Sequence, residues 1–228
     1  MLEHKPSGSQ LVVGNTHLDY HPSRDFVKYT QANFVRSKLA EFMRRECGTL
    51  VPVIMCGDFN SLPVSSVVSA FHGEDIESKE SSWTIPKELK KEGASQVKDF
   101  ARGANKAAAA LTGADKVAFY KKGNKLQKQE DFEPIGKRLQ SAYAFYKKAP
   151  KLKPSEMHLK LNHTMPPFTN YTLKFQGTLD HIFFAEAKLK LLELLTIPEE
   201  SQLRKYGAIP SLEYPSDHFR LEAKFLIL

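Results

Sequence analysis

The sequence predicts an α/β domain in which helices cover a sheet. Apolar, β-branched residues indicate a strand over residues 9–18, a helical pattern follows over 26–45, and a second strand pattern occupies 51–58. This order is typical of a helix packed on a sheet. Strand patterns return in the last third of the chain, over residues 170–175, 179–184, 188–196 and 219–228.

The composition indicates a globular chain with a sizeable core. Its 228 residues are 41% hydrophobic and include 15 phenylalanines, enough for one large domain. No apolar run approaches the roughly 18 residues that a membrane-spanning helix needs, so we expect no membrane partner. The formal net charge of +7 suits an anionic partner such as nucleic acid, although many basic proteins bind none.

Two features concern the compartment. The two cysteines, Cys47 and Cys56, make neither a disulfide framework nor a four-cysteine zinc site, which favours a reducing compartment. The first residues contain no apolar signal region and no Arg/Ser-rich transit pattern. We therefore expect a cytoplasmic protein, with a nuclear or mitochondrial location left open.

The helical pattern over residues 26–45 is amphipathic. Its apolar residues recur at helical spacing and are expected to pack on the sheet. Its charged residues, Lys28 and Arg36 among them, are expected on the opposite face. A shorter helix is expected from residues 63–68, with the serine at 65 or 66 near its cap.

The strand over residues 51–58 runs into an Asp-x-Asn sequence, Asp58 to Asn60, directly after Gly57. Residues i and i+2 of a strand point the same way, so Asp58 and Asn60 are expected to share one side of the sheet edge. A carboxylate there can bind a metal or accept a proton, and an amide can donate to a developing oxyanion. The alternative interpretation is an Asx turn that simply ends the strand.

Residues 73–153 differ from the rest and are expected to form a basic insertion of helices and loops. Between Lys79 and Lys153 the sequence has 18 Lys and Arg against 8 Asp and Glu. An alanine run at 107–110 favours helix. A solvated basic surface and an RNA-facing surface both remain open for this region.

Polar side chains occur at the ends of several of the expected strands. Loops at strand ends commonly supply the residues of enzyme sites. Each residue alone has an ordinary structural interpretation, but together their carboxylates, amide and imidazoles suit metal-assisted attack of water on a phosphodiester. The residues are His17, Asp58 with Asn60, Asp180, and Asp217 with His218. Tyr171 and Phe175 could stack on bases or pack in the core.

Four motifs follow one another along the chain: Asn15-Thr16-His17-Leu18, Cys56-Gly57-Asp58-Phe59-Asn60-Ser61-Leu62-Pro63, Gly177-Thr178-Leu179-Asp180-His181-Ile182-Phe183 and Pro215-Ser216-Asp217-His218. In this order they resemble the endonuclease/exonuclease/phosphatase superfamily. A finer pattern is similar to the branch that holds the CCR4-type deadenylases, nocturnin, the Angel proteins and 2′-phosphodiesterase; it consists of His21-Pro22 with Gln31, residues 139–143, residues 168–172 and Ile209-Pro210-Ser211. That resemblance implies a four-layered α/β sandwich and cleavage of phosphodiesters with Mg²⁺, or Mn²⁺ in its place.

The resemblance also implies catalytic roles. Asp58 would orient or deprotonate the attacking water, and Asn60 would hold that water or donate to the transition-state oxygen. His218 would bond a non-bridging phosphate oxygen, while Asp180 would fix its tautomer and orientation, as the acid does in a hydrolase triad. His17 would contact the scissile phosphate.

The same resemblance implies binding roles. Asp217 and Asp58 would lie in or beside the metal site. Substrate would be bound by His17, Asn60 and His218, with Asn170 as a further candidate. The substrate class implied is RNA, either a 3′ poly(A) end or 2′,5′-linked oligoadenylate, cleaved to release 5′-AMP.

One departure from the family pattern concerns its first half. The family's Asn motif and its Leu-Gln-Glu-type motif, whose glutamate is the principal Mg²⁺ ligand, have no counterpart in residues 1–228. We therefore expect one catalytic domain that lacks its N-terminal part. A fragment inactive alone, an enzyme completed by another chain or segment, and a non-catalytic relative are all open.

Two other functions remain as alternatives. One is a different superfamily phosphoesterase, such as an abasic-site endonuclease or an inositol-polyphosphate phosphatase. The other is a non-catalytic RNA-binding or interaction protein on the same scaffold.

Overall fold

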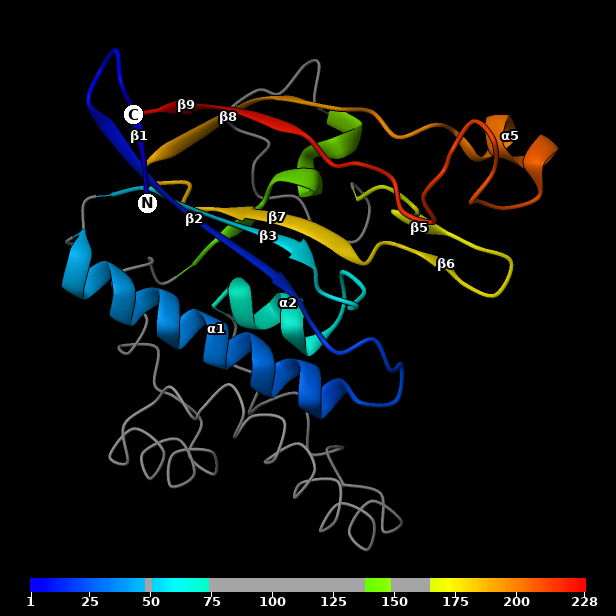
Figure 1. Ribbon diagram of the computed structural model, residues 1–228, viewed down its shortest axis with the longest axis horizontal. Coiled ribbons are helices and arrows are strands. Elements are labelled where there is room, and N and C mark those ends of the chain that lie inside the picture. Colours follow the sequence, from blue (N-terminus) through cyan, green and yellow to red (C-terminus); the bar gives the residue numbers. More distant parts are fainter. Residues whose placement is uncertain (48–50, 74–137, 149–164) are drawn as a thin grey trace, which may run out of the picture. The chain divides into compact units, whose positions relative to one another are not determined.

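The computed structural model describes residues 1–47, 51–73, 138–148 and 165–228 (Figure 1), and all of them belong to one compact unit of the chain. Most of the expected insertion over 73–153 lies outside these residues. Within that range, residues 140–141 pair with the sheet, and residues 139 and 141–145 are buried. The division of the chain into one domain and an insertion otherwise stays a prediction.

The central sheet is mixed and has the strand order β1-β2-β3-β7-β4. Strands β2 and β3 run parallel, and the other neighbouring pairs are antiparallel. The parallel pair is joined by helix α1, as the strand–helix–strand pattern predicted. The strands are β1 (Leu2–His4), β2 (Ser9–His17), β3 (Val53–Asp58), β4 (Gln140–Ser141) and β7 (Asp180–Phe184).

Helices α1 (Asp25–Glu46) and α2 (Ser66–Phe71) cover one face of the sheet (Figure 1). Leu39 and Met43 of α1 join a buried cluster with residues of β2, β3, β7 and α2. The Ser65 side chain caps α2 by accepting the Val68 N–H at 3.4 Å. Both helices were predicted, and the burial of their apolar sides accounts for much of the fold's stability.

The charged face of α1 was predicted less well. Lys28 and Arg36 are 3% and 5% exposed, so the expectation that both lie on the solvent side is wrong. The guanidinium of Arg36 lies 5.8 Å from the centroid of the Phe71 ring, and burial lowers its pKa to about 10. Long charged side chains can lie along an apolar surface in this way.

The other face of the sheet packs against a two-stranded sheet, β8 (Leu189–Leu194) and β9 (Ala223–Ile227), and the 3₁₀ helix η2 (Ala142–Lys148). Tyr143 of η2 is fully buried. Its hydroxyl lies 2.9 Å from the Leu195 carbonyl oxygen and accepts the Glu222 N–H at 3.0 Å. The tyrosine thereby ties η2 to the segments that flank β8 and β9.

A short hairpin replaces the strand expected over residues 170–175. It consists of β5 (Asn170–Tyr171) and β6 (Gln176–Gly177), and the chain turns between them because the Thr172 N–H donates to the Phe175 carbonyl at 2.9 Å. Tyr171 is 3% exposed and packs in the core, whereas Phe175 is 41% exposed.

Beyond β8 the chain forms α5 (Glu200–Leu203) and the 3₁₀ turn η5 (Arg204–Tyr206) before a loop leads to His218. Within the described residues, no helix is both long enough and apolar enough to span a membrane.

Candidate active site

A row of polar residues crosses three neighbouring strands where β2 and β3 end and β7 begins. In the strand register His17 of β2 is the partner of Asp58 of β3, and Asp58 is the partner of Asp180 of β7. Side chains of directly paired residues project from the same face of a sheet. Two carboxylates placed directly opposite each other repel, so the pair of Asp58 and Asp180 lowers the stability of the folded state.

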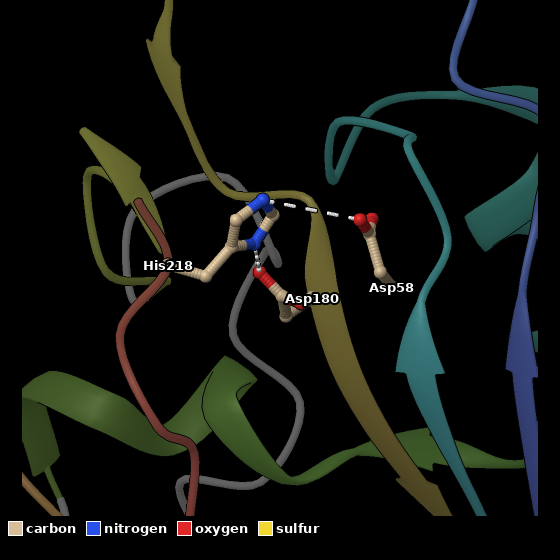
Figure 2. Close-up of side chains that lie close together, drawn as sticks. All are labelled: Asp58, Asp180 and His218. Atoms are coloured by element: carbon tan, nitrogen blue, oxygen red, sulfur yellow. Dashed lines mark hydrogen bonds and ion pairs between the residues drawn. The ribbon is translucent and has the colours of Figure 1, made fainter. Parts of the chain in front are cut away.

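His218 completes the row from a distant part of the sequence. It forms an isolated antiparallel bridge with Asn170 of β5, and the Phe219 N–H donates to the Thr169 carbonyl at 2.7 Å. The hairpin therefore holds the last loop beside β7. Figure 2 shows the His218 imidazole reaching toward both acids: Nδ1 lies 2.7 Å from Oδ2 of Asp180, and Nε2 lies 3.9 Å from Oδ2 of Asp58.

Thr169 fixes the Asp180 carboxylate from the other side. Its hydroxyl donates to Oδ2 of Asp180 at 2.6 Å and accepts the backbone N–H groups of Leu179 and Asp180 at 2.9 and 3.1 Å. One oxygen of Asp180 thus accepts from both Thr169 and His218. Sequence reasoning did not single out Thr169, because these bonds join residues ten or more positions apart; its place directly before Asn170 was the available signal.

Two titrating groups of the site, Asp58 and His218, have raised pKa values for different reasons. Burial raises the pKa of Asp58, and the nearby charge of Asp180 raises it further, against the lowering effect of the hydrogen bond from Asn60. The pKa of His218 is also raised, first by its hydrogen bond to Asp180 and then by the charges of Asp180, Asp58 and Asp217, against its partial burial. A raised imidazole pKa favours the protonated ring, in which Nε2 can donate to an anion.

Asn60 does not share a strand with Asp58. Strand β3 ends at Asp58, so the expected alternation does not apply, and Asn60 has a positive φ of 46°, which asparagine tolerates better than most residues. Its N–H donates to Oδ1 of Asp58 at 2.8 Å, and its Nδ2 donates to the Leu18 carbonyl at 3.0 Å. The Asx-turn interpretation is therefore correct, and the same turn orients the Asp58 carboxylate.

The other predicted residues lie around this group in different environments. His17 is exposed over 72% of its side chain, with Nε2 3.4 Å from Oδ2 of Asp58. Asn170 is 5% exposed and lies under the loop that carries His218. Asp217 is exposed, and its carbonyl accepts the Tyr171 N–H at 3.2 Å.

Three of the described residues could hold one metal ion together. Ligand atoms of Asp58, Asp180 and His218 all lie within 4.8 Å of one another; Asp217 is not part of this group. Mg²⁺ is commonly held by one or two carboxylates, with substrate phosphate and water in its other positions. Since Oδ2 of Asp180 already accepts two hydrogen bonds, the donor set fits a divalent cation held mainly through Asp58.

Comparison with known proteins places this chain in one family. The Endonuclease/Exonuclease/phosphatase family profile matches residues 6–218, so the chain belongs to that family. Two solved structures share the fold. The human nocturnin catalytic domain with bound sulfate has a TM-score of 0.53 and 19% identity over 99% of this chain and 50% of that one. ANGEL2, described as a 2′,3′-cyclic phosphatase, has a TM-score of 0.56 and 23% identity over 94% of this chain and 56% of that one.

The curated relatives belong to the CCR4-like branch of the family, which confirms the resemblance. The CCR4-NOT transcription complex subunit 6-like protein of Danio rerio is 26% identical over 98% of this chain and 34% of its own length. The 2′,5′-phosphodiesterase 12 of Bos taurus is 24% identical over 95% of this chain and 26% of its own length. The chain thus spans about a quarter to a third of these relatives.

Proposed function

We propose that this chain supplies the hydrolytic centre of a Mg²⁺-dependent phosphodiesterase that acts on adenylate-rich RNA. The bond would be at a 3′ poly(A) end or in 2′,5′-linked oligoadenylate, and the product would be 5′-AMP. The observation that carries the proposal is the His218 imidazole bonded to Asp180 at 2.7 Å with its other nitrogen facing Asp58 at 3.9 Å. Hydrolysis of a phosphodiester can use this imidazole and both of the carboxylates beside it.

In this mechanism Asp58 accepts a proton from the water that attacks phosphorus. Asp180 holds Nδ1 of His218, so Nε2 of the protonated ring points at the site and donates to a non-bridging oxygen of the phosphate. The bond from phosphorus to the 2′- or 3′-oxygen of the preceding nucleotide breaks, and AMP keeps the phosphate. The leaving oxygen takes up a proton from solvent, and Asp58 returns the proton of the attacking water to solvent. Ionised Asp58 and protonated His218 coexist at pH values between their two pKa values, both of which are raised.

A bound Mg²⁺ would neutralise charge that develops on the phosphate oxygens. Asp58 is the residue placed to hold it, and Asp217, on the loop that carries His218, would be a second ligand although it lies outside the group of Asp58, Asp180 and His218. The expected dependence on Mg²⁺, with Mn²⁺ as a substitute, rests on this donor set and on the family.

Support for an RNA substrate comes from the relatives. A relative in Yarrowia lipolytica, 24% identical over 99% of this chain and 27% of its own length, is described as a 3′-5′-exoribonuclease subunit of the CCR4-Not complex. The half-exposed ring of Phe175, on the hairpin that also positions His218, is available to stack on a base. For the basic residues over 73–153, most of which lie outside the described residues, a solvated surface and an RNA-facing surface both stay open, and a cytoplasmic location remains a prediction.

The test is AMP release from a 3′-hydroxyl hexa-adenylate and from its 2′,5′-linked isomer. Each is incubated with Mg²⁺ or with EDTA, using the chain and its His218→Ala variant. Release that needs Mg²⁺ and disappears in the variant supports the proposal, and the preferred isomer identifies the linkage. An inositol polyphosphate and an abasic-site duplex are the control substrates, since faster cleavage of either would replace the RNA assignment.

Absence of release from every substrate would have two explanations that a second assay separates. If a longer polypeptide that includes the family's first half restores Mg²⁺-dependent release, the missing ligand lies outside these 228 residues. If release stays absent while RNA binds with a steep dependence on salt, the chain is a non-catalytic RNA-binding member of the family.

A further inference from the structure

The loop that follows β3 is held in place by two buried donors from different parts of the fold. Asn60 and Ser61 leave the strand end with a positive φ at Asn60, which directs their carbonyls into the protein. Nζ of Lys28 donates to the Asn60 carbonyl at 2.9 Å, and Nε2 of His181 lies 2.8 Å from the Ser61 carbonyl. Ser61 itself is 3% exposed.

Lys28 reaches this loop from the first turns of α1. Its side chain is almost fully buried, and its second partner is Oδ1 of Asp25 at 2.8 Å, on a carboxylate that is 68% exposed. A buried ammonium is stable only where it is paired and hydrogen-bonded. The Asn60 carbonyl thus stabilises the buried ammonium of Lys28, and the ammonium in turn holds the Asn60 carbonyl in place.

His181 reaches the loop from β7, where it directly follows Asp180. Neighbouring residues of a strand point to opposite faces, so Asp180 faces the site while His181 lies in the core at 1% exposure. A carbonyl oxygen only accepts, so Nε2 of His181 carries the proton. The ring lies edge-on to Phe59 at 5.7 Å and stacked with Phe183 at 5.5 Å, which fixes the direction of that N–H.

We propose that Lys28 and His181 are positioning residues of the active site, which act through the Asn60 and Ser61 carbonyls to hold the turn that orients Asp58. The link to Asp58 is the Asn60 N–H, which donates to Oδ1 of Asp58 at 2.8 Å. The inference rests on the proposed function for its effect on catalysis, but the effect on the loop follows from the hydrogen bonds alone.

A second buried histidine provides a matched control. His72, directly after α2, is 2% exposed, has Nδ1 2.8 Å from the Leu139 carbonyl and also contacts the Phe183 ring edge-on. Its carbonyl partner lies beside β4, away from the row of His17, Asp58 and Asp180. A phenylalanine at either position keeps a ring in the aromatic cluster and removes a donor to a backbone carbonyl.

The experiment compares His181→Phe with His72→Phe, and Lys28→Met with the conservative Lys28→Arg. His181→Gln serves as the rescue variant, because the glutamine amide nitrogen can occupy the place of Nε2. Two quantities are measured: hydrogen exchange of the Asn60 and Ser61 amides, and kcat and KM for AMP release. All variants are compared at a temperature where each is folded by circular dichroism.

We expect His181→Phe and Lys28→Met to raise exchange at Asn60 and Ser61 and to lower kcat about 10–100-fold, the range for groups that orient catalytic residues. KM should change less than kcat. The rescue variants His181→Gln and Lys28→Arg should recover most of both effects, and His72→Phe should show neither.

The proposal is overturned if loop exchange and kcat in His181→Phe and Lys28→Met match those of His72→Phe. If the chain releases no AMP, loop exchange alone decides the positioning role. The role of the two donors is then measured independently of the proposed function, which the assay with the longer polypeptide tests.

Discussion

The two halves of the site hold their carboxylates in different ways. On the β7 side, Oδ2 of Asp180 accepts from the Thr169 hydroxyl at 2.6 Å and lies 2.7 Å from Nδ1 of His218. On the β3 side, Oδ2 of Asp58 forms longer ion pairs with His17 and His218, at 3.4 and 3.9 Å. The acids are partners in the strand register, yet Asp180 is held by two short hydrogen bonds at Oδ2, whereas Asp58 is held by the Asn60 N–H at Oδ1.

This difference assigns different tasks to the two acids. An oxygen that already accepts two short hydrogen bonds is a poor base but a rigid anchor for an imidazole. An oxygen without such bonds, on an acid whose pKa burial raises, is free to accept a proton from water or to bind a cation. In the proposed mechanism, the β7 side therefore orients the imidazole and the β3 side supplies the reactive carboxylate.

The largest effect is expected from Asp58→Asn, which removes the reactive oxygen of the β3 side. Asparagine can still accept the Asn60 N–H, and it relieves the repulsion from Asp180, so stability should be retained. We expect kcat/KM for AMP release to fall about 10²–10⁴-fold, the usual contribution of a general acid or base. A loss below about threefold would show that Asp58 is not the reactive acid.

The next effect concerns the unit formed by Asp180 and His218. Asp180→Asn and His218→Gln should each lower kcat by about 10²–10³-fold, and the double variant should be little worse than either, because residues that act as one unit are not additive. The measurement is a double-mutant cycle on kcat. Additive losses would mean that the two residues act separately.

A smaller effect is expected from Thr169→Val, which removes the hydroxyl that anchors Asp180. Two backbone N–H groups and one carboxylate oxygen lose a partner, so we expect a loss of about 1–3 kcal/mol in the free energy of unfolding and about a tenfold fall in kcat. Urea denaturation and the AMP assay check the two effects. Thr169→Ser keeps the hydroxyl and is the control; it should restore kcat.

The smallest effect is expected from His17→Ala at the exposed end of the row. The pair with Asp58 is solvent-exposed on the histidine side, and such pairs contribute little to stability. We expect the free energy of unfolding to stay within about 0.5 kcal/mol and KM to rise more than kcat falls. A large loss of stability would contradict the claim that His17 is an exposed, weakly bound member of the site, in contrast to Asp180.

Much of the framework was predictable because it depends on local patterns. The strands ending at His17 and Asp58 and the helix between them follow from hydrophobic periodicity, and Asp180 and His218 were recognisable as polar residues beside apolar strands. The hairpin was not predicted, because an alternating pattern does not reveal the turn after Tyr171, where both the backbone N–H and the hydroxyl of Thr172 bond to Phe175.

The sequence pattern could not identify the residues that support the site, Lys28, His181 and Thr169, for a different reason. Lys28 has the sequence environment of a solvent-facing helical residue, and its burial results from contact with a loop 32 positions away. The partner of His181 is 120 positions away, and Thr169 reaches Asp180 across a hairpin. Contacts between distant segments leave no periodic signal, so only the three-dimensional structure identifies them.

The most direct test of the contrast between the two halves is an NMR titration of His218 in the chain and in Asp180→Asn. This measurement does not depend on activity. A hydrogen bond and a negative charge from Asp180 both stabilise the imidazolium, so the account predicts a His218 pKa above the ordinary value of about 6.5 and a clear fall when Asp180 is replaced. A pKa at or below the ordinary value that is unchanged in Asp180→Asn would contradict the claim that the β7 side holds His218.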